Sequence, residues 1–276
     1  MHTGRAEGRI SLQVTILASG SAGNCTVLET ETTRVLVDAG LSRKEVHRRL
    51  AKLGKSLPGV DGILISHEHT DHIGGLGPLA RQFRAPVYLT QPTHHEADRI
   101  LPSARKLPRV EYIRAGDRLT IGDIEVTAFA VPHDAVEPVG FAFRAHGCRG
   151  AVVTDLGYLP AHVRQHLRDA DCLVLESNHD LEMLKVGPYP WHVKQRVMSR
   201  TGHLSNDTVS EFLADAEGFD ARPRYLVLGH LSETNNTPDV ARICAEEALR
   251  RRPADAAFRG ELLIADQRVP LGPFVL

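Results

Sequence analysis

The sequence predicts one α/β domain in which helices cover the outer faces of mixed β-sheets. Two observations carry this prediction. Short apolar strand segments alternate with helical segments along the chain, and no internal repeat, low-complexity tract or long linker separates them. The 276 residues are 42% hydrophobic and 24% charged, an ordinary globular balance. We therefore treat residues 1–276 as a single domain, with 1–10 as a flexible N-terminal tail.

The first quarter of the chain contains two helices among short strands. The strands expected are Leu12–Leu17, Thr26–Thr30, Arg34–Val37 and Val60–Ile65. Ser42, with Glu45 three residues later, has the pattern of a helix N-cap, and Gly54 ends that helix. The last of these strands runs directly into His67, and a second helix follows over Ile73–Phe83.

Strands and helices alternate through the rest of the chain. The further strands expected are Pro86–Thr90, Val110–Arg114, Arg118–Ile121, Ile124–Val131, Val139–Arg144, Gly150–Thr154, Cys172–Glu176, Arg224–Leu228 and Glu261–Ala265. Helices are expected over His94–Leu101, from Pro160, twice between His179 and Arg200, and over Asn206–Ala216 and Pro238–Arg251.

Composition excludes several classes of protein. The net charge of −1 argues against a globally basic nucleic-acid binder, although a local basic patch stays open. The four cysteines (Cys25, Cys148, Cys172 and Cys244) form no CxxC pair, which is typical of thiols in a reducing cytosol. The polar N-terminus is no secretory signal, and no apolar run reaches the ~18 residues that span a bilayer. We expect a soluble cytoplasmic protein that does not act at a membrane.

The run HEHTDH at 67–72 predicts a metal centre. A single histidine is more often structural than a ligand. Here His67, His69, Asp71 and His72 follow one buried strand, and four such side chains exceed the needs of one open catalytic metal. Imidazole and carboxylate ligands without thiolate suit zinc, manganese or iron. We interpret Glu68 as a bystander that supports the turn.

Three more ligands are expected at strand ends. His133, Asp155 and His230 each come just after an apolar strand, where functional loops lie. Asp155 can bridge two cations. One ion would then be held by His67, His69, His133 and Asp155, and the other by Asp71, His72, Asp155 and His230. Two such ions, about 3.5–4 Å apart, can share a hydroxide that attacks phosphorus or a carbonyl. Asp71 would orient that hydroxide.

Beyond the metal run, the sequence resembles the WalJ (YycJ) family of the metallo-β-lactamase superfamily. The matching stretches lie between about Leu12 and Ala265 and are LASGSAGN, LVDAGLS, SHEHTDH, PHDA, TDLGY, ESNHDLEML, YPWHVKQR, GHLSN and LGHLSETNN. The resemblance implies an αββα four-layer sandwich, with two mixed sheets between helices. It also implies a metal-dependent 5′-to-3′ DNA exonuclease linked to DNA repair. Leu156 and Pro132 depart from the pattern, but neither removes a ligand.

The resemblance also implies a proton donor. His203, in TGHLSN, corresponds to a histidine that protonates the leaving group in related phosphodiesterases, although it could instead be a helix-start histidine bonded to a neighbouring turn. His179, in SNHD, would either orient a ligand or contact substrate.

Several polar residues are candidate substrate contacts. Ser21 and Asn24, in the turn SGSAGN, could approach a phosphate, although a plain hairpin turn explains them as well. Ser232, Asn235 and Asn236 could donate to phosphate oxygens or cap their own loop.

Two further features could contact nucleic acid. Lys44, Arg48 and Lys52 form a stripe on one helix, which could track a phosphate backbone or be a solvated face. Trp191, the only tryptophan, lies among cations and could stack an unpaired base or pack against the sandwich.

Three classes of function remain at this point. The first is a phosphodiesterase acting on DNA, the second a small-molecule hydrolase acting on a thioester, lactone or small phosphodiester, and the third a scaffold that has lost catalysis. The complete ligand set argues against the third, and the specific HLSxxNN and SNHD stretches favour the first. The sequence leaves the identity of the metal, a homo-oligomeric state and any repair partner open.

Overall fold

Two seven-stranded sheets form the centre of the molecule. The computed structural model describes residues 12–276, so the expected tail at 1–10 lies outside the described residues. The first sheet runs in the order β14 (Leu271–Val275), β1 (Gln13–Ala18), β2 (Cys25–Glu29), β3 (Arg34–Val37), β4 (Gly62–Leu64), β5 (Val87–Leu89) and β6 (Val110–Tyr112). The second runs in the order β13 (Glu261–Ile264), β12 (Tyr225–Gly229), β11 (Cys172–Glu176), β10 (Cys148–Val153), β9 (Val139–Ala145), β8 (Ile124–Ala130) and β7 (Arg118–Ile121).

Both sheets are mixed, as predicted. In the first, β14, β1, β2 and β3 pair antiparallel, whereas β3 to β6 pair parallel. In the second, β10 to β13 pair parallel and β7 to β10 antiparallel. Parallel strands bring their carboxyl ends to one edge of a sheet, where ligand sites usually form.

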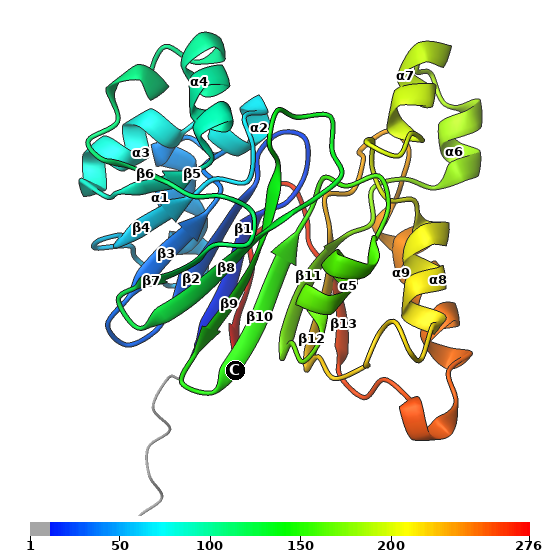
Figure 1. The fold of residues 1–276 in the computed structure, drawn as a ribbon. Coiled ribbons are helices and arrows are strands. Elements are labelled where there is room, and N and C mark those ends of the chain that lie inside the picture. The colour runs from blue at the N-terminus through cyan, green and yellow to red at the C-terminus, as the bar shows by residue number, and fades with distance from the viewer. Residues whose placement is uncertain (1–11) are drawn as a thin grey trace, which may run out of the picture.

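Helices cover the outer face of each sheet (Figure 1). On the first sheet lie α1 (Arg43–Lys52), α2 (Thr70–Ile73), α3 (Leu76–Phe83) and α4 (Gln91–Ile100), with the short turn η1 (Ala104–Lys106). On the second lie α5 (Ala161–Leu167), α8 (Asn206–Ala214) and α9 (Pro238–Arg250), with η2 (Ala254–Ala256), whereas α6 (Leu181–Val186) and α7 (Trp191–Val197) stand beyond the ends of its strands. The predicted αββα architecture is therefore confirmed.

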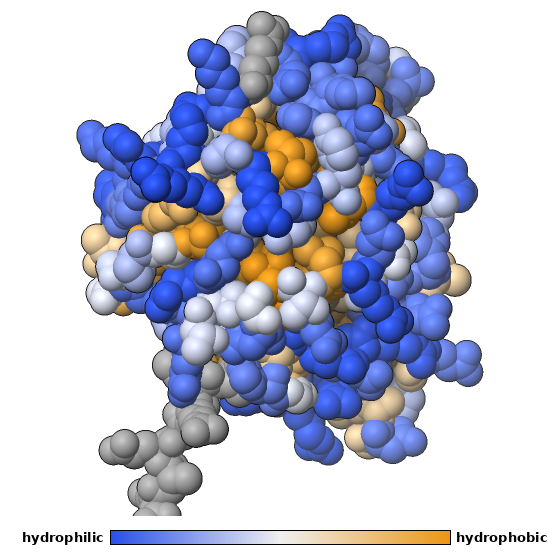
Figure 2. Space-filling model, turned by 60° about the vertical axis from the view of Figure 1, so that its left-hand side comes forward, coloured by the Kyte–Doolittle hydropathy of each residue, from blue (hydrophilic) through white to orange (hydrophobic). Residues whose placement is uncertain are grey.

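Three hydrophobic cores lie between the four layers of sheets and helices. The inner faces of the two sheets share one core, which includes Ile16, Leu28, Phe141 and Val227. A second core joins the first sheet to its helices, and a third joins the second sheet to α5, α8 and α9. The side seen in Figure 2 is mainly hydrophilic, with a group of hydrophobic residues showing near its middle.

Two details differ from the sequence prediction. The single helix expected over 73–83 is broken into α2 and α3, because Gly74 and Gly75 pack against the loop before α1. The Gly75 N–H donates to the carbonyl of Ala39 at 2.7 Å. Strand β14, which contains Pro273, was not among the predicted strands. It lies at the edge of its sheet, where a proline removes no ladder hydrogen bond.

Candidate metal centre

The predicted ligands come from strand ends of both sheets. His67, His69, Asp71 and His72 lie between β4 and the end of α2, whereas His133, Asp155 and His230 follow β8, β10 and β12. Asp155 and His230 adopt left-handed backbone conformations, with φ of 61° and 54°. Such conformations are uncommon outside glycine and concentrate at functional sites. The sharp turn that each makes brings its side chain back to the edge where the two sheets meet.

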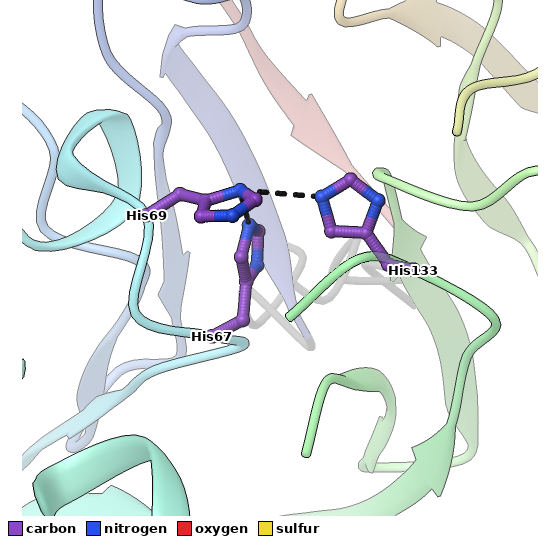
Figure 3. Close-up of side chains that lie close together, drawn as sticks. All are labelled: His67, His69 and His133. Carbon is purple, nitrogen blue, oxygen red and sulfur yellow. Dashed lines mark hydrogen bonds between the residues drawn. The ribbon is translucent and has the colours of Figure 1, made fainter. Parts of the chain in front are cut away.

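Three imidazole rings meet at one point (Figure 3). The Nδ1 atom of His69 lies 3.1 Å from Nε2 of His67 and 3.2 Å from Nε2 of His133. His67 and His133 are buried. Burial lowers the pKa of His67 well below its ordinary value, and burial also lowers the pKa of His133. Burial therefore favours the neutral form of His67 and of His133, which is the form that binds a metal ion, and the ring nitrogens of the three histidines lie close enough together to share one ion.

A second group lies beside the first. The Nε2 atom of His72 is 3.3 Å from Oδ2 of Asp71 and 3.2 Å from Oδ2 of Asp155. His230 reaches the same place, with Nε2 at 3.5 Å from Oδ2 of Asp71. The other oxygen of Asp155 is 3.8 Å from Nε2 of His133. Asp155 thus lies between the two groups.

The histidines and carboxylates of the centre stabilise one another's charged forms. Burial alone would raise the pKa of Asp71 and of Asp155, but neighbouring histidines hold both pKa values well below the ordinary range. Burial would likewise lower the pKa of His72, but the carboxylates of Asp38, Asp155 and Asp71 raise it well above the ordinary value. The centre is a place where negative charge attracts positive charge, whether a proton or a metal ion supplies it.

The donor set fits divalent metal ions. Oδ2 of Asp155 and Nε2 of His230 are buried without a hydrogen-bond partner, although each lies among the other candidate ligands. A buried polar atom without a partner costs roughly 1–3 kcal/mol. Coordination of a cation would remove that cost, and imidazole with carboxylate suits zinc or manganese.

Asp38 orients His72, a role that the sequence reading missed. Its Oδ2 accepts a hydrogen bond from Nδ1 of His72 at 2.8 Å, and its Oδ1 accepts from the backbone N–H of Ser66 at 2.9 Å. The carboxylate is buried at the end of β3, also with a left-handed φ of 60°. A carboxylate bound to Nδ1 fixes the ring so that Nε2 faces the metal centre.

Glu176 links two histidines and was also missed. It is fully buried at the end of β11. Its Oε1 accepts from Nδ1 of His203 and from Nδ1 of His230, both at 2.8 Å. Its Oε2 accepts from the backbone N–H groups of Leu156 and Leu204. Burial would raise the pKa of Glu176, but His203 and His230 lower it to about 2, so the carboxylate is ionised.

His203 is the more accessible of the two histidines bound to Glu176. Its side chain is 20% exposed, against 3% for His230. Burial would lower the pKa of His203, but Glu176 and Asp155 raise it. Leu156, one of the two departures from the family pattern, contributes only its backbone N–H here, so that departure leaves the arrangement intact.

Asn24 joins the centre, and Ser21 does not. The Asn24 side-chain amide donates to Oδ2 of Asp71 at 3.0 Å, and its backbone N–H donates to the Asp71 carbonyl. Ser21 is exposed in the preceding turn. Glu68 is directed away from the cluster, since its Oε1 accepts from the backbone N–H of Val136 at 2.8 Å.

The other candidate substrate contacts are buried beside the centre. Ser232 accepts from the backbone N–H groups of Thr234 and Asn235, and Asn236 bonds to Ser177, Asn206 and Thr237. These bonds favour the interpretation that the two side chains build their loop. His179 is buried, which lowers its pKa to about 4, and its Nδ1 has no partner. Oδ1 of Asn235 likewise has no partner.

Cationic side chains line one side of the centre. Arg196 pairs with Asp134, next to His133, and the Arg200 guanidinium lies 4.2 Å from the ring centroid of Tyr158.

Trp191 is 63% exposed, so it does not pack against the sandwich. On α1, Arg48 binds the carboxylate of Glu45 through two nitrogens, which favours a solvated face for that helix.

Comparison with known proteins agrees with this geometry. The family model described as "Beta-lactamase superfamily domain" matches residues 33–231. An exodeoxyribonuclease YycJ of Bacillus anthracis is 36% identical over 264 residues, covering 95% of this chain and 98% of the relative. The chain belongs to the WalJ (YycJ) family of the metallo-β-lactamase superfamily. A second member of the WalJ family, exodeoxyribonuclease WalJ of Streptococcus pneumoniae serotype 2, is 38% identical over 237 residues, covering 84% of this chain and 86% of the relative.

The fold agrees as well. The metallo-β-lactamase fold protein YhfI from Bacillus subtilis matches with a TM-score of 0.67 at 19% identity, covering 95% of this chain and 99% of YhfI. Within residues 12–276, no helix is long and apolar enough to cross a membrane.

Proposed function

We propose that this protein is a two-metal exodeoxyribonuclease that hydrolyses DNA from the 5′ end. The observation that carries the proposal is the pairing of a complete imidazole–carboxylate donor set with a histidine anchored beside it on a buried glutamate. The relatives named exodeoxyribonuclease, matched over most of both chains, support DNA as the substrate. The 5′ polarity and a role in DNA repair rest on the family resemblance.

The donor set divides into two overlapping groups. His67, His69 and His133 would hold one ion and Asp71, His72 and His230 the other, with Asp155 shared. Zinc or manganese suits these donors. When bound, the ions would supply Lewis acidity toward the phosphodiester and toward the attacking water.

Side chains of the protein would orient the attacking water and protonate the leaving group. Asp71 is ionised and only partly buried, so it can accept a hydrogen bond from the attacking water and orient it. Glu176 stabilises the imidazolium form of His203, because its buried carboxylate binds Nδ1. The remaining nitrogen, Nε2, can then give a proton to the oxygen that leaves.

A substrate panel tests the function. Metal-loaded protein would be incubated with end-labelled duplex DNA, single-stranded DNA and RNA, and separately with a thioester and bis(p-nitrophenyl) phosphate. We expect 5′ mononucleotides from DNA with the wild type and not with Asp71→Ala. Turnover of the small substrates without cleavage of any polynucleotide would instead establish a small-molecule hydrolase.

A further inference from the structure

The α6–α7 hairpin, which contacts the candidate metal centre at its C-terminal end, carries an exposed tryptophan. Trp191, at the start of α7, is 63% exposed, and Val186, at the end of α6, is 84% exposed. Figure 1 shows the two helices standing beyond the ends of the strands of the second sheet. The far end of α7 is tied to the centre, since the carbonyl of Val197 accepts from the backbone N–H of His203 at 3.0 Å.

The indole has no partner of its own in the described part of the chain. Lys194 is the buried residue of α7, and its Nζ donates to the carbonyl of Lys185, which fixes one helix of the hairpin to the other. Pro188 and Pro190 precede Trp191 and restrict the backbone conformations of the segment that leads into α7. A large aromatic side chain held in water on a restrained support is typical of a recognition surface.

The charge around Trp191 selects the partner. Between Glu182 and Asp207 the sequence has no carboxylate but has four cations: Lys185, Lys194, Arg196 and Arg200. Lys194 is buried, and of the other three only Arg200 has no carboxylate partner within residues 12–276, since Lys185 pairs with Glu182 and Arg196 with Asp134. Arg196 and Arg200 are exposed and lie on the side of the hairpin that faces the centre, through Asp134 and Tyr158. Such a surface complements a polyanion. A second copy of this chain would place the same cations opposite themselves if the contact were symmetric.

We infer that Trp191 stacks an unpaired base of single-stranded DNA whose phosphates run past Arg196 and Arg200 toward the metal centre. The inference rests on the proposed nuclease function and adds to it a substrate contact outside the metal ligands.

The single tryptophan makes stacking directly observable. Trp191 is the only tryptophan in the chain, so all indole fluorescence comes from this position. Metal-loaded protein would be titrated with a phosphorothioate thymidine decamer, which resists cleavage, and with an abasic decamer of the same charge. Stacking predicts that the thymidine decamer quenches the emission and that the abasic decamer does not. Equal quenching by both, or by neither, would overturn the inference.

Affinity provides the second readout. Stacking of one base predicts that Trp191→Ala weakens binding of the thymidine decamer by roughly 5- to 150-fold. The variant should bind the abasic decamer as the wild type does, and Trp191→Phe should restore most of the affinity. Val186→Ser, a change at the other exposed apolar side chain of the hairpin, should match the wild type. An equal loss for both decamers in Trp191→Ala, or a monomer–dimer shift in sedimentation with both variants, would contradict base stacking.

The two proposals fail differently. If the wild type digests DNA but its fluorescence and affinity ignore the bases, the stacking contact is wrong and the nuclease stands. If the wild type neither binds nor digests DNA, the nuclease proposal fails, and the stacking contact fails with it.

Discussion

The buried carboxylate of Glu176 accepts hydrogen bonds at 2.8 Å from Nδ1 of His203 and from Nδ1 of His230. One side chain therefore orients both a candidate metal ligand and the candidate proton donor. Its other oxygen accepts hydrogen bonds from two backbone N–H groups, so hydrogen bonds hold both carboxylate oxygens in place. Changes at Glu176 should act on catalysis through these two histidines.

Glu176→Gln should slow DNA hydrolysis while the fold persists. The amide keeps the shape of the side chain but no longer stabilises a charged His203, so we expect kcat to fall by roughly 10²- to 10⁴-fold, the usual contribution of general acid–base catalysis. The loss should be smaller for bis(p-nitrophenyl) phosphate, whose leaving group needs no proton. Glu182→Gln, at an exposed carboxylate, is the matched control. Equal losses on both substrates would show that Glu176 has no part in protonating the leaving group.

Asp38→Asn should weaken metal binding. The carboxylate holds Nδ1 of His72 at 2.8 Å, and loss of such an orienting carboxylate typically costs 10- to 100-fold in metal affinity. Titration of zinc against a chromophoric chelator measures this without reference to activity. Asp61→Asn, at an exposed aspartate just before β4, should bind zinc as the wild type does. Unchanged zinc affinity in Asp38→Asn would remove Asp38 from the centre.

Gly40→Ala should destabilise the protein and disturb Asp71. A Cβ atom at Gly40 would lie 1.7 Å from the carbonyl oxygen of Asp71, far inside contact distance. Overpacking of this kind costs about 1–3 kcal/mol in the free energy of unfolding, which urea denaturation measures. At Gly59 a Cβ atom would meet nothing within 4 Å, so Gly59→Ala is the control. Equal unfolding midpoints for the two variants would contradict the packing described.

Cys25 and Cys172 should resist alkylation in the folded protein. Burial raises the pKa of each thiol to about 12, so the thiolate that reacts is scarce below that pH. The folded state should therefore leave both unmodified by iodoacetamide at pH 8, and urea should expose both, as peptide mass spectrometry can record. Rapid labelling of either thiol without urea would show that the apolar cores around them open easily.

The candidate metal ligands could be proposed from sequence because they lie shortly after apolar strands. His133, Asp155 and His230 come after β8, β10 and β12. The end of a strand lies at the edge of its sheet whichever strands pair with it. The resemblance to the WalJ family predicted the role of His203 and the αββα order of the layers.

Asp38 and Glu176 were not predictable in the same way. Each lies at the end of its own strand, but its role depends on which histidine the neighbouring chain brings to it. The parallel pairing of β11 with β12 aligns Glu176 with Gly229, next to His230, and no local pattern encodes that register. The exposure of Trp191 likewise depends on where α7 lies in the fold. The segment of β14 contains Pro273, and proline is uncommon in strands except at sheet edges.

The metal content of the protein tests the central claim most directly. Elemental analysis of purified protein, loaded with zinc and freed of excess, should give two ions per chain for the wild type. For Asp155→Ala and Asp155→Asn, with folding verified by circular dichroism, it should give one or fewer, because the shared carboxylate is lost. One ion in the wild type, or two in the folded Asp155 variants, would contradict a two-metal centre bridged by Asp155.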